Sequence, residues 1–190
     1  MALDSESRWR LVRMKKAKAE AEVNAEPTIR AAGAADLTAI VEIYNYYIKN
    51  SVVTFDVDEL SLQDWRDKFH HIQELRMPFI VAESSSGQIL GFAYVAPWRQ
   101  KAAYKKTVEN SIYLRPAATG KRIGTKLLTE LLSRCKDAGI KEVVAVMSDK
   151  GAESSIALHE QFGFKRQGHL AKVGFKFGRW LGVVLMQKSL

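Results

Sequence analysis

The residues best suited to chemistry lie in a strongly basic stretch that runs from Arg99 to Lys126. The whole chain of 190 residues has a net charge of +8, and this stretch alone accounts for +7. Its cations are Arg99, Lys101, Lys105, Lys106, Arg115, Lys121, Arg122 and Lys126. Its only acidic residue is Glu109. A run of like charge is most often a solvated face, but a buried carboxylate at its centre would be suited to accept a proton.

A glycine-containing segment in the same stretch is typical of an anion site. The sequence SIYLRPAATGKRIG predicts a strand that ends at Arg115, a loop, and a helix that begins near Arg122. A helix N-terminus offers unpaired backbone N–H groups and a partial positive charge. Gly120 and Gly124 allow close approach of a ligand, and a pyrophosphate fits such a junction. A plain helix start is the alternative, and the ATP-type pattern G-x-x-x-x-G-K-[ST] is absent.

Two further side chains have types that suit catalysis or binding. His159 is expected on an apolar helix face near Ile156 and Phe162, where a catalytic histidine and a hydrogen-bonded core histidine are both open. Arg99 is suited to hold a carboxylate through paired hydrogen bonds. None of the four histidines has metal-ligand spacing to another histidine or to the cysteine, so no metal is predicted.

The composition favours one globular domain with an N-terminal extension. Residues 1–27 are rich in Ala, Lys and Glu and end at Pro27, and the domain is expected over 28–190. The hydrophobic share is 47%, and no apolar run is long enough to predict a membrane span. The single cysteine excludes an internal disulfide and indicates a reducing compartment, and the first residues do not resemble a secretory signal, so a cytoplasmic protein is expected.

The elements that must position these residues alternate between strands and helices. Strands are expected at 28–32, 79–84, 88–97, 107–115, 141–147, 164–171 and 175–187. Helices are expected over about 36–48, 61–72, 122–139 and 153–163. This order predicts an α/β fold with a mixed sheet, and the absence of G-x-G-x-x-G after the first strand argues against a dinucleotide-binding fold.

Several phrases together resemble one enzyme family. Gly120-Lys-Arg-Ile-Gly124 resembles the acetyl-CoA pyrophosphate loop of the GNAT superfamily of N-acetyltransferases. TVENS, LHEQFGF and KFGRW are similar to the branch that contains phosphinothricin and methionine sulfoximine/sulfone acetyltransferases, and the resemblance covers about residues 28–188. It implies a single GNAT-like domain, with a mixed, mostly antiparallel sheet, splayed central strands and flanking helices.

The resemblance also implies a role for individual residues. The pantetheine arm of acetyl-CoA would lie along Ile112, Tyr113 and Leu114. The pyrophosphate would meet Gly120, Lys121, Arg122, Ile123, Gly124 and Thr125. The amine substrate would lie near Arg99, Gln100, Lys101, Glu109, Asn110 and Ser111. Glu109 and His159 match the two groups discussed as catalytic in the family.

The implied reaction is transfer of an acetyl group from acetyl-CoA to the α-amino group of a small amino acid or analogue. Phosphinothricin, methionine sulfoximine and methionine sulfone are the implied types of substrate, and a homodimer is expected because relatives are commonly dimers. Two positions depart from the family pattern: Arg122 stands where many relatives have glycine, and Ala152 stands where asparagine is frequent. Both bear on coenzyme affinity more than on the fold.

Two alternatives stay open at this point. The basic stretch would also suit a module that binds RNA or another polyanion without acetylating an amino acid, which would need exposed aromatic residues among the cations. Within enzymes, a protein N-terminal or polyamine acetyltransferase is the rival, although a cationic stretch at 99–101 argues against a polyamine. The positive charge is concentrated at the strand–loop–helix junction, so coenzyme A is the favoured polyanion and nucleic acid is not expected.

Overall fold

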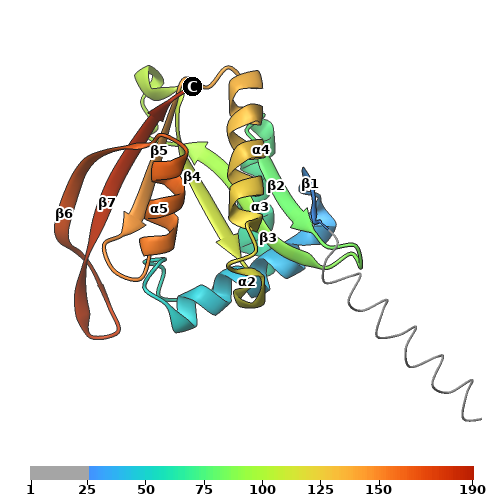
Figure 1. The fold of residues 1–190 in the computed structure, drawn as a ribbon, viewed down its shortest axis with the longest axis horizontal. Coiled ribbons are helices and arrows are strands. Elements are labelled where there is room, and N and C mark those ends of the chain that lie inside the picture. Colours follow the sequence, from blue (N-terminus) through green and yellow to red (C-terminus); the bar gives the residue numbers. More distant parts are fainter. Residues whose placement is uncertain (1–25) are drawn as a thin grey trace, which may run out of the picture.

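The computed structural model describes residues 26–190, so the expected extension lies outside the described residues except for its last two. The order of the main elements is the predicted one (Figure 1). The strands are β1 (Thr28–Ala31), β2 (Phe79–Glu83), β3 (Ile89–Pro97), β4 (Thr107–Leu114), β5 (Glu142–Ser148), β6 (Lys165–Lys176) and β7 (Arg179–Ser189). The α-helices are α2 (Leu37–Asn50), α3 (Leu62–Glu74), α4 (Ile123–Asp137) and α5 (Glu153–Gln161), with 3-10 turns at Ala34–Asp36, Ala102–Tyr104 and Pro116–Ala118.

The strands form a seven-stranded sheet in the order β1-β2-β3-β4-β5-β7-β6. Every neighbouring pair is antiparallel except β4 and β5, which are parallel. Their pairing covers only Thr107–Glu109 of β4 and ends where Glu109 faces Val144 of β5. β4 stays paired with β3 as far as Leu114, so the two central strands separate beyond Glu109. The expected mixed, mostly antiparallel sheet with splayed central strands is confirmed.

Helices cover both faces of the sheet, and each face has its own core (Figure 1). Under α4 and α5 the core is largely aliphatic, because α4 places Leu127, Leu128 and Leu131 on one face at helical spacing. Under α2 and α3 it is aromatic: the Trp65 ring meets Phe92 edge-on at 5.4 Å between centroids. The sheet is therefore held from two sides while its central strands diverge.

The prediction for the last two strands was wrong in its boundaries. A gap was expected at 172–174, but β6 continues through it to Lys176. The register of β6 against β7 shifts between Leu170 and Gly174, and Lys172 has φ +54°, which marks a β-bulge. The chain reverses later, at Phe177 and Gly178, which both have positive φ as a two-residue hairpin turn requires. Residues 172–174, which the sequence pattern left as a gap between two strands, contain this β-bulge.

Candidate active site

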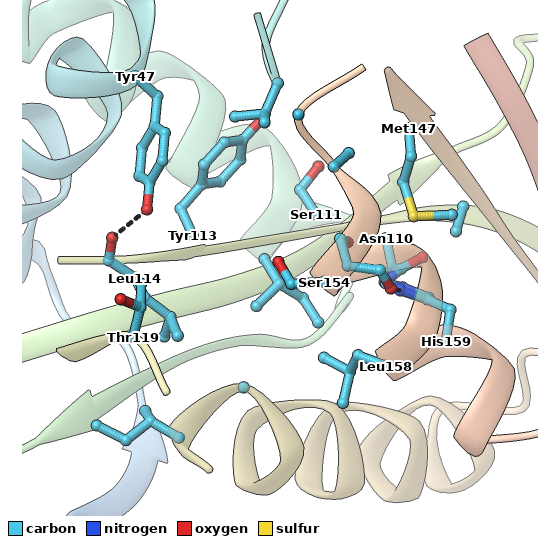
Figure 2. A pocket seen from close by; sticks show the side chains of 18 of the residues that line it. Tyr47, Asn110, Ser111, Tyr113, Leu114, Thr119, Met147, Ser154, Leu158 and His159 are labelled. Carbon is cyan, nitrogen blue, oxygen red and sulfur yellow. Dashed lines mark hydrogen bonds between the residues drawn. The ribbon is translucent and has the colours of Figure 1, made fainter. Parts of the chain in front are cut away.

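A pocket of about 630 Å³ lies where β4 and β5 separate. One wall is β4 from Asn110 to Leu114, and the other is β5 from Ala145 to Met147. The starts of α4 and α5 add to the lining, so segments far apart in sequence meet around it (Figure 2). Beyond Glu109 the backbone groups that β4 turns away from β3 have no β5 partner, which leaves a strand edge exposed to this pocket. Such an edge can pair with an extended amide-containing chain.

The predicted anion loop borders the same pocket at the start of α4. Gly120, Arg122, Ile123, Gly124 and Thr125 all line it, whereas Lys121 is exposed and does not. Thr119 lines the pocket as well, which the residue-by-residue prediction did not include. The unpaired N–H groups at the beginning of α4 therefore face a cavity, as an anion site requires.

Arg122 and Gly124 have structural roles that their residue types alone do not indicate. Arg122 has φ +59°, the left-handed region that glycine occupies without strain. A Cβ atom on Gly124 would lie 3.3 Å from Cδ2 of Leu158, so this glycine allows α5 to pack closely against α4. Lys126 in the first turn of α4 forms an exposed ion pair with Glu26 at 2.9 Å.

The side chains of β4 alternate between the two faces of the sheet. Ile112 and Leu114 pack against the core under α4, and Tyr113 packs in the aromatic core under α2. By the same alternation Asn110 lies on the α4 face, and Glu109 lies on the α2 face. The structure thus places the two predicted catalytic residues, Glu109 and His159, on opposite sides of the sheet.

Glu109 is half-buried and pairs with Ala96 of β3, the residue before Pro97, where a second, more open pocket of about 650 Å³ begins. That pocket is lined by Pro97, Trp98, Arg99, Gln100, Lys101 and Tyr104, which include three predicted substrate residues. Burial raises the pKa of Glu109, and the Arg99 guanidinium acts in the opposite direction. Arg99 itself stacks on Trp98, with 4.2 Å between its guanidinium carbon and the ring centroid. The carboxylate and the predicted carboxylate-binding cation are therefore neighbours.

His159 is buried, and both of its ring nitrogens have hydrogen-bond partners. Nδ1 lies 2.7 Å from the carbonyl oxygen of Ser155, and Nε2 lies 2.9 Å from Nδ2 of Asn110 (Figure 2). Burial lowers the pKa of His159, with the Ser155 contact partly opposing the effect. Burial thus favours the neutral ring, and the catalytic role of His159 stays a prediction.

Sequence reasoning missed several residues that the fold brings to the pocket between β4 and β5. Tyr47 of α2 donates a hydrogen bond from its hydroxyl to the carbonyl oxygen of Leu114 at 2.7 Å, so it fixes the end of β4. Ser51, Val53, Met147, Ser154 and Ser155 also line the pocket. Ala152, noted as a departure from the family pattern, lines it too. The only sequence signal was the run of mostly small residues Gly151-Ala-Glu-Ser-Ser at the start of α5, which allows a ligand to approach.

Within 26–190, no cluster of three or more His, Cys, Asp or Glu side chains is arranged to hold a metal ion. No helix in that range is both long and apolar enough to cross a membrane.

Comparison with known proteins identifies the class of protein that this fold and site define. Residues 40–164 match the model of the acetyltransferase (GNAT) family, and the chain belongs to that family. It is 36% identical over 163 residues to the phosphinothricin N-acetyltransferase of Alcaligenes faecalis, covering 86% of this chain and 82% of that one. It is also 36% identical to the L-methionine sulfoximine/L-methionine sulfone acetyltransferase of Pseudomonas aeruginosa, covering 86% and 94%.

Among solved structures, the chain is similar to a GNAT superfamily phosphinothricin acetyltransferase from Sinorhizobium meliloti in complex with acetyl-CoA. The TM-score is 0.83 and the sequences are 42% identical, with 87% of this chain and 89% of that chain covered. The resemblance to this branch of the family is therefore confirmed over the domain that contains the site.

Proposed function

We propose that the protein is an acetyl-CoA-dependent N-acetyltransferase that acetylates the α-amino group of a small amino acid or amino-acid analogue. The observation that carries this proposal is the pocket between β4 and β5, which joins an exposed strand edge to the N-terminus of α4. Both parts match the chemistry of acetyl-CoA, an extended amide arm with a pyrophosphate at its other end. The named relatives, which act on phosphinothricin and methionine sulfoximine or sulfone, indicate the substrate class.

The residues present fit the coenzyme. The backbone of residues 120–125 would meet the pyrophosphate, with Arg122 supplying a further cation. Ile112, Tyr113 and Leu114 would lie along the pantetheine arm through the strand edge. Acetyl-CoA supplies the thioester that the amine attacks. Backbone N–H groups of the separated strand are suited to stabilise the negative charge that develops on the carbonyl oxygen.

Glu109 is the residue that we assign to proton removal. An ammonium group has no lone pair for attack, so a proton must leave the substrate before or during the reaction. The raised pKa of Glu109 makes its carboxylate a better base than an exposed one. Glu109 pairs with Ala96, next to the strand end that lines the Arg99 pocket, so an amino acid held in that pocket would lie nearby. Arg99 would bind the substrate carboxylate, with Gln100 and Lys101 beside it.

A thiol-release assay tests the proposal. Acetyl-CoA is combined with a panel of amino acids, methionine sulfone, methionine sulfoximine and phosphinothricin, and with a polyamine and a short peptide as competing amine classes. We expect turnover with one or more of the α-amino acids and little with the polyamine. Turnover confined to the peptide or the polyamine would contradict the substrate class, and no turnover alongside tight, salt-sensitive RNA binding would contradict the enzymatic function.

The β6–β7 hairpin supports a homodimer, which we include in the proposal. Five large apolar side chains on it are exposed: Leu170, Val173, Phe175, Phe177 and Trp180. β6 is also the last strand of the sheet, so its outer edge has no strand partner among the described residues. An exposed apolar group on an unpaired edge strand is typical of a protein interface.

A further inference from the structure

The contacts of His159 fix the orientation of its neighbour Asn110. The carbonyl oxygen of Ser155 can only accept a hydrogen bond, so Nδ1 of His159 must carry the ring proton. Nε2 then has a lone pair, and it accepts a hydrogen bond from Nδ2 of Asn110 at 2.9 Å. The reverse orientation of the Asn110 amide would set its oxygen against that lone pair. The neutral ring therefore determines which way Asn110 presents its carbonyl oxygen.

That carbonyl oxygen, Oδ1, is buried and has no hydrogen-bond donor within residues 26–190. Asn110 as a whole is 6% exposed. It lines the pocket between β4 and β5, at the end where the two strands begin to separate (Figure 2). An unpaired buried acceptor has a cost to stability, which a donor from a ligand would remove. Met147, whose flexible thioether lines the same end, can move to admit such a donor.

We propose that His159 is a positioning residue, which holds Asn110 so that its Oδ1 accepts a hydrogen bond from an N–H group of the reacting pair. This inference rests on the proposed acetyltransferase function and gives His159 a role other than proton transfer. Two groups can supply the N–H. One is the amide of acetyl-CoA next to the cysteamine carbons, and the other is the attacking amine. The α4 face on which Asn110 lies is the coenzyme side of β4.

A pair of variants at position 159 separates positioning from base catalysis. His159→Gln keeps one acceptor and one donor but cannot act as a base near neutral pH, whereas His159→Leu keeps neither. We expect His159→Leu to lower kcat/KM by roughly tenfold or more, as the loss of an oriented hydrogen bond allows, and His159→Gln to recover most of that loss. The acid limb of the kcat/KM profile should be the same in His159→Gln and wild type. Equal losses in both variants, together with loss of that limb, would overturn the proposal.

A coenzyme analogue identifies the donor. In this analogue an ester oxygen replaces the cysteamine-side N–H of acetyl-CoA, and binding of both compounds is measured by calorimetry. If the coenzyme is the donor, wild type prefers acetyl-CoA to the analogue by roughly tenfold and Asn110→Leu shows no preference. If the amine is the donor, Asn110→Leu has the same relative affinity for acetyl-CoA and the analogue as wild type. Its KM for the amine instead rises by roughly tenfold. If neither quantity changes, the proposal is wrong.

Controls keep these results interpretable. Thermal unfolding of each variant shows whether it folds, and Asn110→Ala replaces Asn110→Leu if the larger side chain prevents folding. The calorimetric comparison needs no turnover, so it still reports on Asn110 if the amine substrates in the panel are not accepted. A failure of the acetyltransferase proposal is therefore distinguishable from a failure of the Asn110 proposal.

Discussion

At the scale of single residues, the environment of Glu109 suits the proton transfer that we propose for it. Burial disfavours its charged form, while the neighbouring Arg99 favours it, and burial is the larger effect. The pKa is raised in the folded protein, so folding is progressively disfavoured as pH rises through the range from the ordinary glutamate value up to the folded-state value. Above that range the full cost is present. The protein thus retains a carboxylate that weakens its own fold, as expected of a functional group.

Replacing Glu109 with glutamine tests both the proposed proton transfer and the cost of the buried charge to stability. Glu109→Gln should lower kcat by about 10²- to 10⁴-fold, the usual contribution of a general base, and leave the Kd for acetyl-CoA near the wild-type value. At neutral pH the variant should unfold at the same or a higher temperature, because it no longer buries a charge. Steady-state kinetics, calorimetry and thermal unfolding measure the three quantities. Wild-type turnover in this variant would show that another group removes the proton.

A single substitution tests the proposed substrate-binding role of Arg99 and its effect on the pKa of Glu109. Arg99→Met removes a bidentate partner for a carboxylate, so the KM for an amino acid should rise by roughly 10- to 100-fold. It also removes the cation that lowers the pKa of Glu109, so the acid limb of kcat/KM should move to higher pH. Arg66→Met, which removes an exposed arginine from α3, is the matched control. If the acid limb of kcat/KM stays at the wild-type pH, Arg99 does not influence the titration of the group that limits activity.

At the scale of elements, the β6–β7 hairpin and the loop between α2 and α3 hold each other in place. Lys176 is only 4% exposed and donates a hydrogen bond from Nζ to the carbonyl oxygen of Thr54 at 2.8 Å. Burial lowers the pKa of Lys176, although Asp56 partly opposes this. The ring of Phe55 occupies the space that a side chain at Gly174 would need. The loop that enters the pocket at Ser51 and Val53 is thus braced by the hairpin.

Two glycine substitutions in β6 test this contact. A Cβ atom on Gly174 would lie 2.4 Å from the Phe55 ring, whereas a Cβ on Gly168 would lie 4.0 Å from Cδ1 of Leu185. Gly174→Ala should therefore lower the free energy of unfolding by about 1–3 kcal/mol, the usual cost of overpacking. Gly168→Ala should change it little. Denaturant titrations measure both variants. Equal free energies of unfolding would mean that the Phe55 ring moves aside without loss of stability.

The order of elements could be predicted because each has a local signature. Leucines at helical spacing mark α4, and a continuous apolar run marks β5. The boundaries of the β6–β7 hairpin could not be predicted, because the bulge at Lys172 depends on pairing with β7 rather than on the residues of β6. The contact between Asn110 and His159 joins residues 49 positions apart and has no local signal. The family resemblance placed Arg99 and Glu109 near a common substrate, which stays a prediction, and in the structure the charge of Arg99 lowers the pKa of Glu109.

At the scale of the whole molecule, the exposed apolar residues of the hairpin predict the oligomeric state. The rings of Phe175 and Trp180 pack against each other at 5.4 Å between centroids, yet they are 58% and 56% exposed. A double substitution of both by glutamate should convert a dimer into a monomer, because charges would then face each other across the interface. Leu75→Glu, at an exposed position after α3, is the control. Sedimentation analysis distinguishes the states, and a wild-type monomer would contradict the dimer.

The hairpin also connects this proposed interface with the pocket loop. Residues of the same strand, β6, are exposed at Phe175 and buried against the loop at Lys176. The amine KM of the glutamate variant is therefore informative, since loss of the interface should loosen the brace on residues 51–56. This long-range arrangement was beyond sequence reasoning, because it depends on how two distant segments meet.

The alternation of side chains along β4 has a consequence for how this enzyme class diversifies. Residues 109, 111 and 113 face the α2 side of the sheet, and residues 110, 112 and 114 face the α4 side. Under the proposed function the amine would approach from the first side and acetyl-CoA would lie on the second. Selection for a new amine can act on the first set while the second conserves acetyl-CoA binding, although the two sets interleave within one short strand. A mutant library restricted to 109 and to the loop positions 99–101, none of which lines the pocket between β4 and β5, should thus yield altered substrate preference with unchanged coenzyme affinity. Because alternate side chains of β4 lie on opposite faces of the sheet, substitutions on one face can change one binding site and leave the other unaltered.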